Sequence, residues 1–361
     1  MCRIMYIRNG LTLVAGGAGF VGSHLCRALL EEGHRVVCID NLQTSRASNL
    51  LGLQNHAHFT FIKADITEPL PDEVTRLEGQ ITRIYNLACA ASPVLYQENP
   101  EHTMLTSVLG TNRLLRLAEV SGARFLLAST SEVYGDPEVH PQPEDYRGHV
   151  NCTGPRACYD EGKRAAETLA FDYARSGRAE VRVARIFNTY GPNMRIDDGR
   201  VISNLACQAL SGEPLTVYGD GSQTRSFCYV ADTVDGLRRL MECPLAEMEP
   251  VNIGNPDEIT IRQLVSALAR IIGHPLDLNF RALPTDDPQR RRPVIDRARD
   301  LLGWTPQTSL EDGLELTLGW FARELKSNHP QQLVERHGHE RVLRSAMGEK
   351  EPAGTAVPQR M

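Results

Sequence analysis

The sequence predicts an α/β fold, with a doubly wound parallel sheet followed by a smaller C-terminal lobe. Strand-like and helix-like segments alternate through the first half of the 361-residue chain, as they do when helices cover both faces of a parallel sheet. A glycine-rich turn separates the first predicted strand from the first predicted helix, and the predicted helices end at glycines. Together these observations indicate a Rossmann-type sheet, the architecture that binds dinucleotides.

The predicted elements follow from apolar patterning and from helix-ending residues. The predicted strands are short apolar runs at residues 11–14, 36–39, 59–62, 84–87, 125–128 and 181–186. Three predicted helices, each followed by a glycine, span residues 21–32, 100–120 and 155–175, before Gly33, Gly122 and Gly177. The order of these elements predicts a sheet built largely from the first half of the chain.

A change of character after Asn188 predicts the domain organisation. Segments become shorter and richer in Gly, Pro and Asn there, so residues 1–187 are assigned to a nucleotide-binding domain and 188–325 mainly to a substrate-binding lobe. The chain is expected to return to the first domain around 226–254. Residues 326–361 are polar and poor in aromatics, which predicts a disordered tail.

Composition narrows the function classes. A hydrophobic content of 41% is ample for a large core, and a net charge of −6 argues against a nucleic-acid or membrane-surface partner. The N-terminal apolar run is too short for a signal or membrane-spanning segment. Nine cysteines occur without a CxxC pair, so reduced thiols and a cytoplasmic location are expected. No metal site is predicted, since two histidines in the polar tail lack further ligands.

The turn "GGAGFVG" places Gly16, Gly19 and Gly22 at a spacing that lets the backbone approach a pyrophosphate. Such a turn alone is a weak signal. The second strand strengthens it by ending at Asp40, where a carboxylate accepts hydrogen bonds from an adenosine ribose and repels a 2′-phosphate, which favours NAD over NADP. Asp65 closes the third strand; it is placed to contact an adenine and is equally consistent with a turn or helix cap.

Tyr159 and Lys163 lie four residues apart, on one face of a predicted helix. A lysine ammonium beside a phenol lowers the pKa of the phenol, which makes Tyr159 a candidate base that removes a proton from a substrate hydroxyl. The YxxxK pattern is common on solvated helices. Its significance here comes from the glycine turn and from the strand ending at Thr130, which precede it in the expected order.

From these residues the chain resembles the extended short-chain dehydrogenase/reductase family over roughly residues 10–325. In that family a Ser or Thr at the position of Thr130 hydrogen-bonds the reacting sugar hydroxyl. The runs "TSEVYGDPEVHPQ", "GPRACYDEGKRAAE", "RVARIFNTYGPNM", "DGRVISN", "GEPLTVYGDGSQTRSFCYV" and "DDPQRRRP" resemble one branch of it, the UDP-glucuronate decarboxylases. Ser131 stands where dehydratases carry an Asp, and Glu132 where epimerases carry a smaller uncharged residue, so the resemblance argues against both reactions.

The resemblance implies NAD-dependent conversion of UDP-glucuronic acid to UDP-xylose through a 4-keto intermediate, with NAD recycled in each turnover. Tyr159 is then base and acid, and Lys163 is its partner. Glu132 and one arginine of "QRRRP" manage a second proton, and the family pattern selects Arg291 over its two neighbours. The cofactor positions it implies are Gly16, Gly19, Phe20, Val21, Gly22, Asp40, Asn41, Asp65, Leu87, Tyr159 and Lys163. The substrate positions it implies are Ser92, Pro93, Asn188, Arg195, Asn204, Tyr218, Arg225 and Arg291.

The resemblance also implies a homodimer, formed through the helices at 100–120 and 155–175. Met104, Leu105 and Val108 are consistent with an apolar interface there, and equally with an ordinary core stripe. "NLACAASP" departs from the family by carrying Cys89 and an alanine where Ser-Pro is usual, close to the expected position of the substrate carboxylate. Three other functions stay open: a UDP-sugar 4-epimerase, a decarboxylase that releases its 4-keto pentose, and a non-catalytic NAD-binding sensor.

Overall fold

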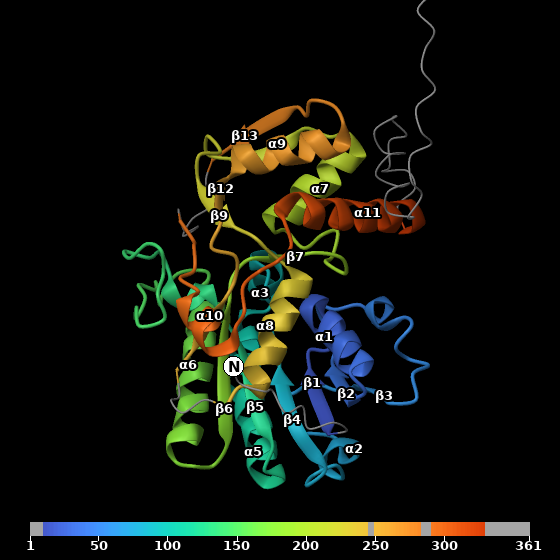
Figure 1. Ribbon diagram of the computed structural model, residues 1–361, viewed down its shortest axis with the longest axis vertical. Coiled ribbons are helices and arrows are strands. Elements are labelled where there is room, and N and C mark those ends of the chain that lie inside the picture. Colours follow the sequence, from blue (N-terminus) through green and yellow to red (C-terminus); the bar gives the residue numbers. More distant parts are fainter. Residues whose placement is uncertain (1–9, 245–248, 283–289, 329–361) are drawn as a thin grey trace, which may run out of the picture.

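The computed structural model describes residues 10–244, 249–282 and 290–328, and within them a seven-stranded parallel sheet forms the larger part of the molecule (Figure 1). The strand order is β11-β6-β5-β4-β1-β2-β3. The strands are β1 (Leu11–Ala15), β2 (Arg35–Asp40), β3 (Phe59–Lys63), β4 (Ile81–Asn86), β5 (Arg124–Thr130), β6 (Glu180–Ile186) and β11 (Val251–Ile253). The order reverses beside β1, so the predicted doubly wound fold is confirmed.

Helices cover both faces of this sheet, as its apolar strands require. On one face α1 and α8 pack together, with α10 beside α8; on the other lie α4, α5 and α6. The helices of these two layers are α1 (Phe20–Glu31), α2 (Asp72–Thr75), α3 (Pro93–Glu98), α4 (Pro100–Leu105), α5 (Thr111–Ser121), α6 (Ala157–Arg175), α8 (Val230–Glu242) and α10 (Asp296–Leu302). Short 3-10 turns are η1 (Ala47–Leu50) and η3 (Ser131–Tyr134).

The single helix predicted over residues 100–120 is interrupted by a π-helical segment, η2 (Thr106–Gly110), between α4 and α5. A Cβ added to Gly110 would stand 2.5 Å from Cδ1 of Ile66, so this segment approaches the loop after β3 closely. Single π turns widen a helix by one residue without ending it. The apolar periodicity of the sequence did not reveal this change.

The chain after β6 builds a second, smaller layer of helices and short strands, seen at the top of Figure 1. Its core is a separate apolar cluster around Leu210, Leu264 and Phe321. Its elements are β7 (Thr189–Tyr190), α7 (Val201–Ser211), β8 (Leu215–Tyr218), β9 (Thr224–Ser226), β10 (Cys228–Tyr229), β12 (Glu258–Thr260), α9 (Ile261–Ile272), β13 (Leu278–Arg281) and α11 (Leu310–Asn328).

The chain crosses back to the large sheet through α8 and β11, which pairs with β6. Helix α11 continues to Asn328, so the predicted disordered tail was wrong for residues 326–328; its remainder, with the two tail histidines, lies outside the described residues. Among the described helices, none combines the length and the apolar character needed to cross a bilayer.

Candidate active site

The glycine-rich turn lies between β1 and α1, at the carboxyl end of the first strand. Gly16 has φ +77°, and a Cβ on it would come within 2.7 Å of the Ala88 backbone nitrogen, just past the end of β4. A Cβ on Gly22 would stand 2.1 Å from the carbonyl oxygen of Gly16. Only glycine satisfies both positions, and the turn leaves the amino end of α1, which starts at Phe20, open to an anion.

Two carboxylates flank this turn at the ends of β2 and β3. Asp40 accepts hydrogen bonds from the Ala18 amide at 3.0 Å and from the Ser45 hydroxyl at 2.6 Å. Asp65 accepts from Asn41 at 2.7 Å and pairs with His102 at 2.8 Å.

Burial by itself would raise the pKa of Asp65, but hydrogen bonds from Thr67, Asn41 and His102 outweigh it and lower the pKa to about 2. Asp65 also accepts a hydrogen bond from the Thr67 amide at 2.8 Å. This contact belongs to a turn, which is the alternative role that the sequence indicated for Asp65.

Tyr159, Lys163 and Thr130 come together at the end of β5, as the sequence predicted. The phenol of Tyr159 hydrogen-bonds the side chain of Thr130, and Lys163 Nζ lies 5.8 Å from the centroid of the Tyr159 ring. Lys163 donates to the Ala128 carbonyl at 2.9 Å, which fixes its ammonium beside the strand end. All three side chains are buried.

The electrostatics of this trio differ from the expectation of a lowered phenol pKa. Burial raises the pKa of Tyr159, and the same burial lowers the pKa of the Lys163 ammonium. Both directions arise because the charged form of each group loses solvation in the closed site. Tyr159 is therefore a neutral phenol at neutral pH, which can donate a proton.

Tyr96, which sequence reasoning did not single out, stacks on Tyr159 with ring centroids 5.0 Å apart and planes inclined by 1°. Its hydroxyl is buried and has no hydrogen-bond partner among the described residues. Burial raises the pKa of Tyr96 to about 12, so the group is a neutral donor. A buried hydroxyl without a partner is costly in a closed protein and is typical of a site that receives a ligand.

Glu132 is held between two arginines from distant parts of the chain. Its carboxylate pairs with Arg156 at 2.5 Å on one oxygen and with Arg291 on the other. Arg291 also donates to the Gly135 carbonyl at 3.2 Å, and burial lowers its pKa to about 10, so it stays protonated at neutral pH. The structure thus brings Arg291, and not its neighbours, to Glu132. Arg156 was missed, although it lies three residues before Tyr159.

The predicted substrate positions are spread around this centre. Ser92 is buried and donates to the Asp198 carbonyl, and Pro93 begins α3. Arg195 is paired with Asp197 at 2.6 Å. The others lie near the second lobe, with Asn188 before β7, Asn204 in α7, Tyr218 at the exposed end of β8, and Arg225 in β9. These eight residues therefore come from both the large domain and the second lobe. Phe20, Val21 and Leu87 lie at the glycine turn and the end of β4, partly buried.

Arg200 is a second arginine that sequence reasoning missed. It pairs with Asp198 at 2.8 Å, and its guanidinium lies 5.7 Å from the Phe20 ring centroid. Burial by itself would lower the pKa of Arg200, but Asp198 outweighs it and raises the pKa. Its charge also acts on Tyr159, which places a cation between the glycine turn and the catalytic trio.

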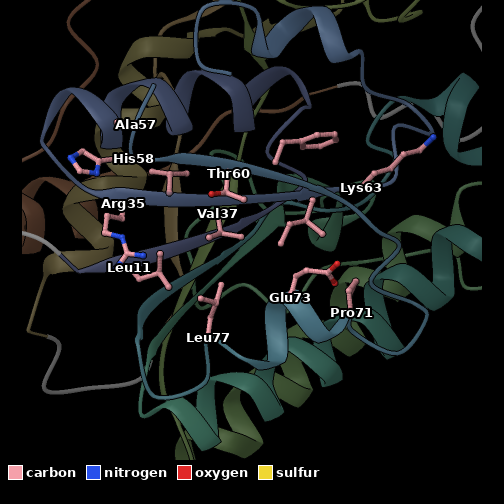
Figure 2. Close-up of a pocket in the computed structure, with 13 residues that line it drawn as sticks. Leu11, Arg35, Val37, Ala57, His58, Thr60, Lys63, Pro71, Glu73 and Leu77 are labelled. Atoms are coloured by element: carbon pink, nitrogen blue, oxygen red, sulfur yellow. The ribbon is translucent and has the colours of Figure 1, made fainter. Parts of the chain in front are cut away.

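A cavity of about 690 Å³ lies elsewhere, along the edge strand β3 (Figure 2). Arg35 and His58 stand at one end of it, and Lys63 and Glu73 at the other. Its walls come from β1, β2, β3, α2 and the adjoining loops, and neither Tyr159 nor Glu132 lines it. It is separate from the predicted catalytic centre.

The residues of the turn fit a dinucleotide cofactor. The glycines let the turn pack tightly where a Cβ would overlap backbone atoms, the first turn of α1 carries no side-chain cap, and Asp40 stands at the end of the adjacent strand. These are the features that accept a pyrophosphate and a ribose in doubly wound sheets.

Comparisons with known proteins agree with this geometry. Residues 12–254 match the NAD dependent epimerase/dehydratase family. UDP-glucuronic acid decarboxylase 1 of Danio rerio is 51% identical over 89% of this chain and 75% of its own length. UDP-glucuronic acid decarboxylase 3 of Arabidopsis thaliana is 53% identical over 85% of this chain and 88% of its own.

Among solved structures, UDP-glucuronic acid 4-epimerase of Bacillus cereus, in complex with UDP-glucuronic acid and NAD, superposes with a TM-score of 0.79. It is 30% identical and covers 87% of this chain and 99% of its own. The chain therefore belongs to the NAD dependent epimerase/dehydratase family, where its curated relatives at 51–53% identity are UDP-glucuronic acid decarboxylases.

Proposed function

We propose that this chain is a UDP-glucuronate decarboxylase, which converts UDP-glucuronic acid to UDP-xylose and carbon dioxide with NAD recycled in each turnover. The observation that carries the proposal is Glu132, held between Arg156 and Arg291 beside the Thr130, Tyr159 and Lys163 trio. Curated relatives at 51–53% identity over most of the chain support it.

Bound NAD supplies reversible hydride exchange at sugar carbon four, and the glycine turn with Asp40 would hold it. Asn41, Asp65 and the residues flanking the turn complete the proposed cofactor site. Tyr159 takes the proton of the 4-hydroxyl, which Thr130 orients, and Lys163 stabilises the resulting phenolate by its charge. Because burial raises the pKa of Tyr159, this base is proposed to form in the complex with substrate and NAD.

The 4-ketone places the substrate carboxylate beta to a carbonyl, so the bond between carbons five and six breaks and its electron pair remains as an enolate. Carbon dioxide leaves. The enolate then takes one proton at carbon five, in a step assigned to Glu132 and Arg291. Tyr159 finally returns a proton to the oxygen on carbon four. Arg291 is suited to this electrostatic role because it is buried, protonated and directly paired with Glu132.

The smaller lobe, residues 188–325, is proposed to bind the UDP moiety through Asn188, Arg195 and Arg225, with Asn204 and Tyr218 nearby and Ser92 and Pro93 on the sugar side. Arginine suits a diphosphate because its fork makes paired hydrogen bonds. Since Arg195 is paired with Asp197, binding would exchange that carboxylate for phosphate.

The test is incubation of the purified protein with UDP-glucuronic acid and NAD⁺ in heavy water, followed by NMR of the products and by absorbance of reduced nicotinamide. UDP-xylose carrying one deuterium at carbon five, without lasting reduced nicotinamide, is the expected result. A 4-keto pentose with persistent reduced nicotinamide would indicate an enzyme that releases its intermediate. An uncharged UDP-sugar turned over while UDP-glucuronic acid stays unchanged would indicate a 4-epimerase.

We further propose a homodimer that works in the cytoplasm. Leu105 and Leu109 are 41% and 36% exposed on α4 and η2, which contact α6, and this is the apolar face such a dimer needs. The described cysteines are all free, as in a reducing compartment. Light scattering at micromolar concentration tests the dimer, with Leu105→Asp expected to give monomers. Cell fractionation tests the location.

A further inference from the structure

The segment that carries Arg291 is fastened to the large domain by Gln142, which is fully buried in the loop after η3. The side-chain oxygen of Gln142, Oε1, accepts a hydrogen bond from the backbone amide of Arg292 at 2.9 Å. The backbone amide of Gln142 in turn donates to the Arg292 carbonyl at 2.8 Å. The Val294 amide donates to the Gln142 carbonyl at 2.9 Å. The two segments, 150 residues apart in sequence, thus form an isolated parallel bridge.

The carboxamide of Gln142 is itself fixed, because its Nε2 donates to the Val139 carbonyl at 2.8 Å. Asn252 is a second buried anchor, and its Nδ2 donates to the carbonyls of both Gln142 and Val294 at 3.0 Å. The Asn252 Oδ1 accepts from the Tyr134 hydroxyl at 2.8 Å. The backbone that follows Arg291 is therefore held by buried polar groups of the large domain.

This anchorage decides where the guanidinium of Arg291 lies. An arginine side chain is long and rotamer-rich, so its tip is placed only as well as its backbone is. Arg291 meets Glu132 with one nitrogen and the Gly135 carbonyl with another, a geometry that tolerates little backbone shift. The Ser226 hydroxyl also donates a hydrogen bond to the backbone carbonyl of Arg291, at 3.2 Å.

We propose that Gln142 is a positioning residue of the reaction, which holds Arg291 against Glu132 through its side-chain hydrogen bond to the Arg292 amide. The proposal rests on the proposed function, in which this pair serves the steps after oxidation at carbon four. Gln142 does not belong to the Tyr159, Lys163 and Thr130 trio, so its loss should leave that first oxidation intact.

The test compares Q142M, which keeps the length of the side chain and loses its hydrogen bonds, with the wild-type enzyme in single turnovers. Reduced nicotinamide should appear at the wild-type rate, within about twofold, because oxidation does not use Arg291. Its disappearance should slow by about ten- to a hundredfold, because misplacing a catalytic group by an ångström costs up to this much. KM for UDP-glucuronic acid should change less than the later steps.

Two further variants separate positioning from folding. Q142E keeps an oxygen for the Arg292 amide and, when its buried carboxyl group is protonated, a donor for the Val139 carbonyl. Measured at a pH low enough to protonate that group, it should recover most of the later steps. Q208M is the matched control, because Gln208 makes a similar two-point contact with Thr216 in the second lobe, at 2.9 and 3.0 Å. It should lower the melting temperature without changing the shape of the nicotinamide transient.

Equal behaviour of Q142M and Q142E, whether both normal or both defective, would overturn the proposal. So would a defect in Q142M that slows appearance and disappearance of reduced nicotinamide alike. Failure of the wild-type enzyme to form UDP-xylose would instead refute the proposed function. Refutation of the role of Gln142 and refutation of the proposed function are therefore distinguishable.

Discussion

Replacing Glu167, which lies on α6, by alanine tests how much the stability of the fold depends on one buried ion pair between α6 and β6. The Glu167 carboxylate accepts from the Ser129 hydroxyl at 2.5 Å and from Arg185 at 2.8 and 3.0 Å. The side chains of Glu167 and Arg185 are 9% and 12% exposed. Burial by itself would lower the pKa of Arg185, but its hydrogen bonds with Glu167 outweigh this and raise the pKa.

The magnitude follows from what the substitution leaves behind. Breaking a buried pair costs about 3–5 kcal/mol, because one charge stays buried without its partner. Arg185 keeps hydrogen bonds to the Tyr134 hydroxyl at 3.0 Å and the Glu144 carbonyl at 2.9 Å, so the lower end applies. We expect E167A to lose about 3 kcal/mol, which corresponds to a drop in Tm of roughly 4–5 °C for a chain of this size, at about 2.1 cal/mol/K of unfolding entropy per residue.

Urea unfolding at neutral pH, followed by circular dichroism, measures this loss. The double variant E167A/R185M should recover part of it, since it removes the unpaired charge as well. The matched control is E119A, which breaks the exposed Glu119–Arg178 pair and should leave Tm unchanged. A loss below about 1 kcal/mol in E167A would refute the reasoning, since it would show the pair to be effectively solvated.

Three other substitutions test the site. Asp65 has a pKa of about 2, below its ordinary 3.8, so its stabilisation is present above that ordinary value and disappears as the pH falls through 2. D65N should therefore lose about 1 kcal/mol near pH 7 in urea titrations and match the wild type near pH 2, the effect being reduced by solvent because the side chain is partly exposed; a constant difference would contradict this. Lys163 has a lowered pKa, so its charge penalises the folded state at neutral pH, and the penalty declines as the pH rises through the folded value toward 10.5. K163M should unfold at higher urea than the wild type at pH 7 while losing activity, and lower stability would contradict this. In G22A the added methyl meets the Gly16 carbonyl, so calorimetric affinity for NAD⁺ should fall at least about tenfold, whereas G79A, in open space, should bind normally; equal affinities would dismiss the role of the turn.

Local patterns made much of this protein predictable. The glycine turn, the strand ending at Asp40 and the four-residue spacing of Tyr159 and Lys163 are determined within one or two elements. The structure places the turn and Asp40 at the carboxyl ends of the adjacent strands β1 and β2, and Tyr159 and Lys163 on α6. The selection of Arg291 came from the resemblance of a short run to a family pattern. Such features are readable because backbone geometry repeats with fixed periods, so apolar spacing and glycines mark the elements and their ends.

Tertiary structure alone decided which side chains meet. The stacking of Tyr96 on Tyr159, the approach of Arg156 to Glu132 and the bridge from Gln142 to Arg292 join residues up to 150 positions apart. The raised pKa of Tyr159 is likewise a product of burial, which no spacing encodes. Sequence determined the sheet, the turn and the candidate chemistry, because these depend on local backbone preference. The electrostatic setting of that chemistry was decided by packing, because desolvation and charge contacts arise only when distant segments close around the site.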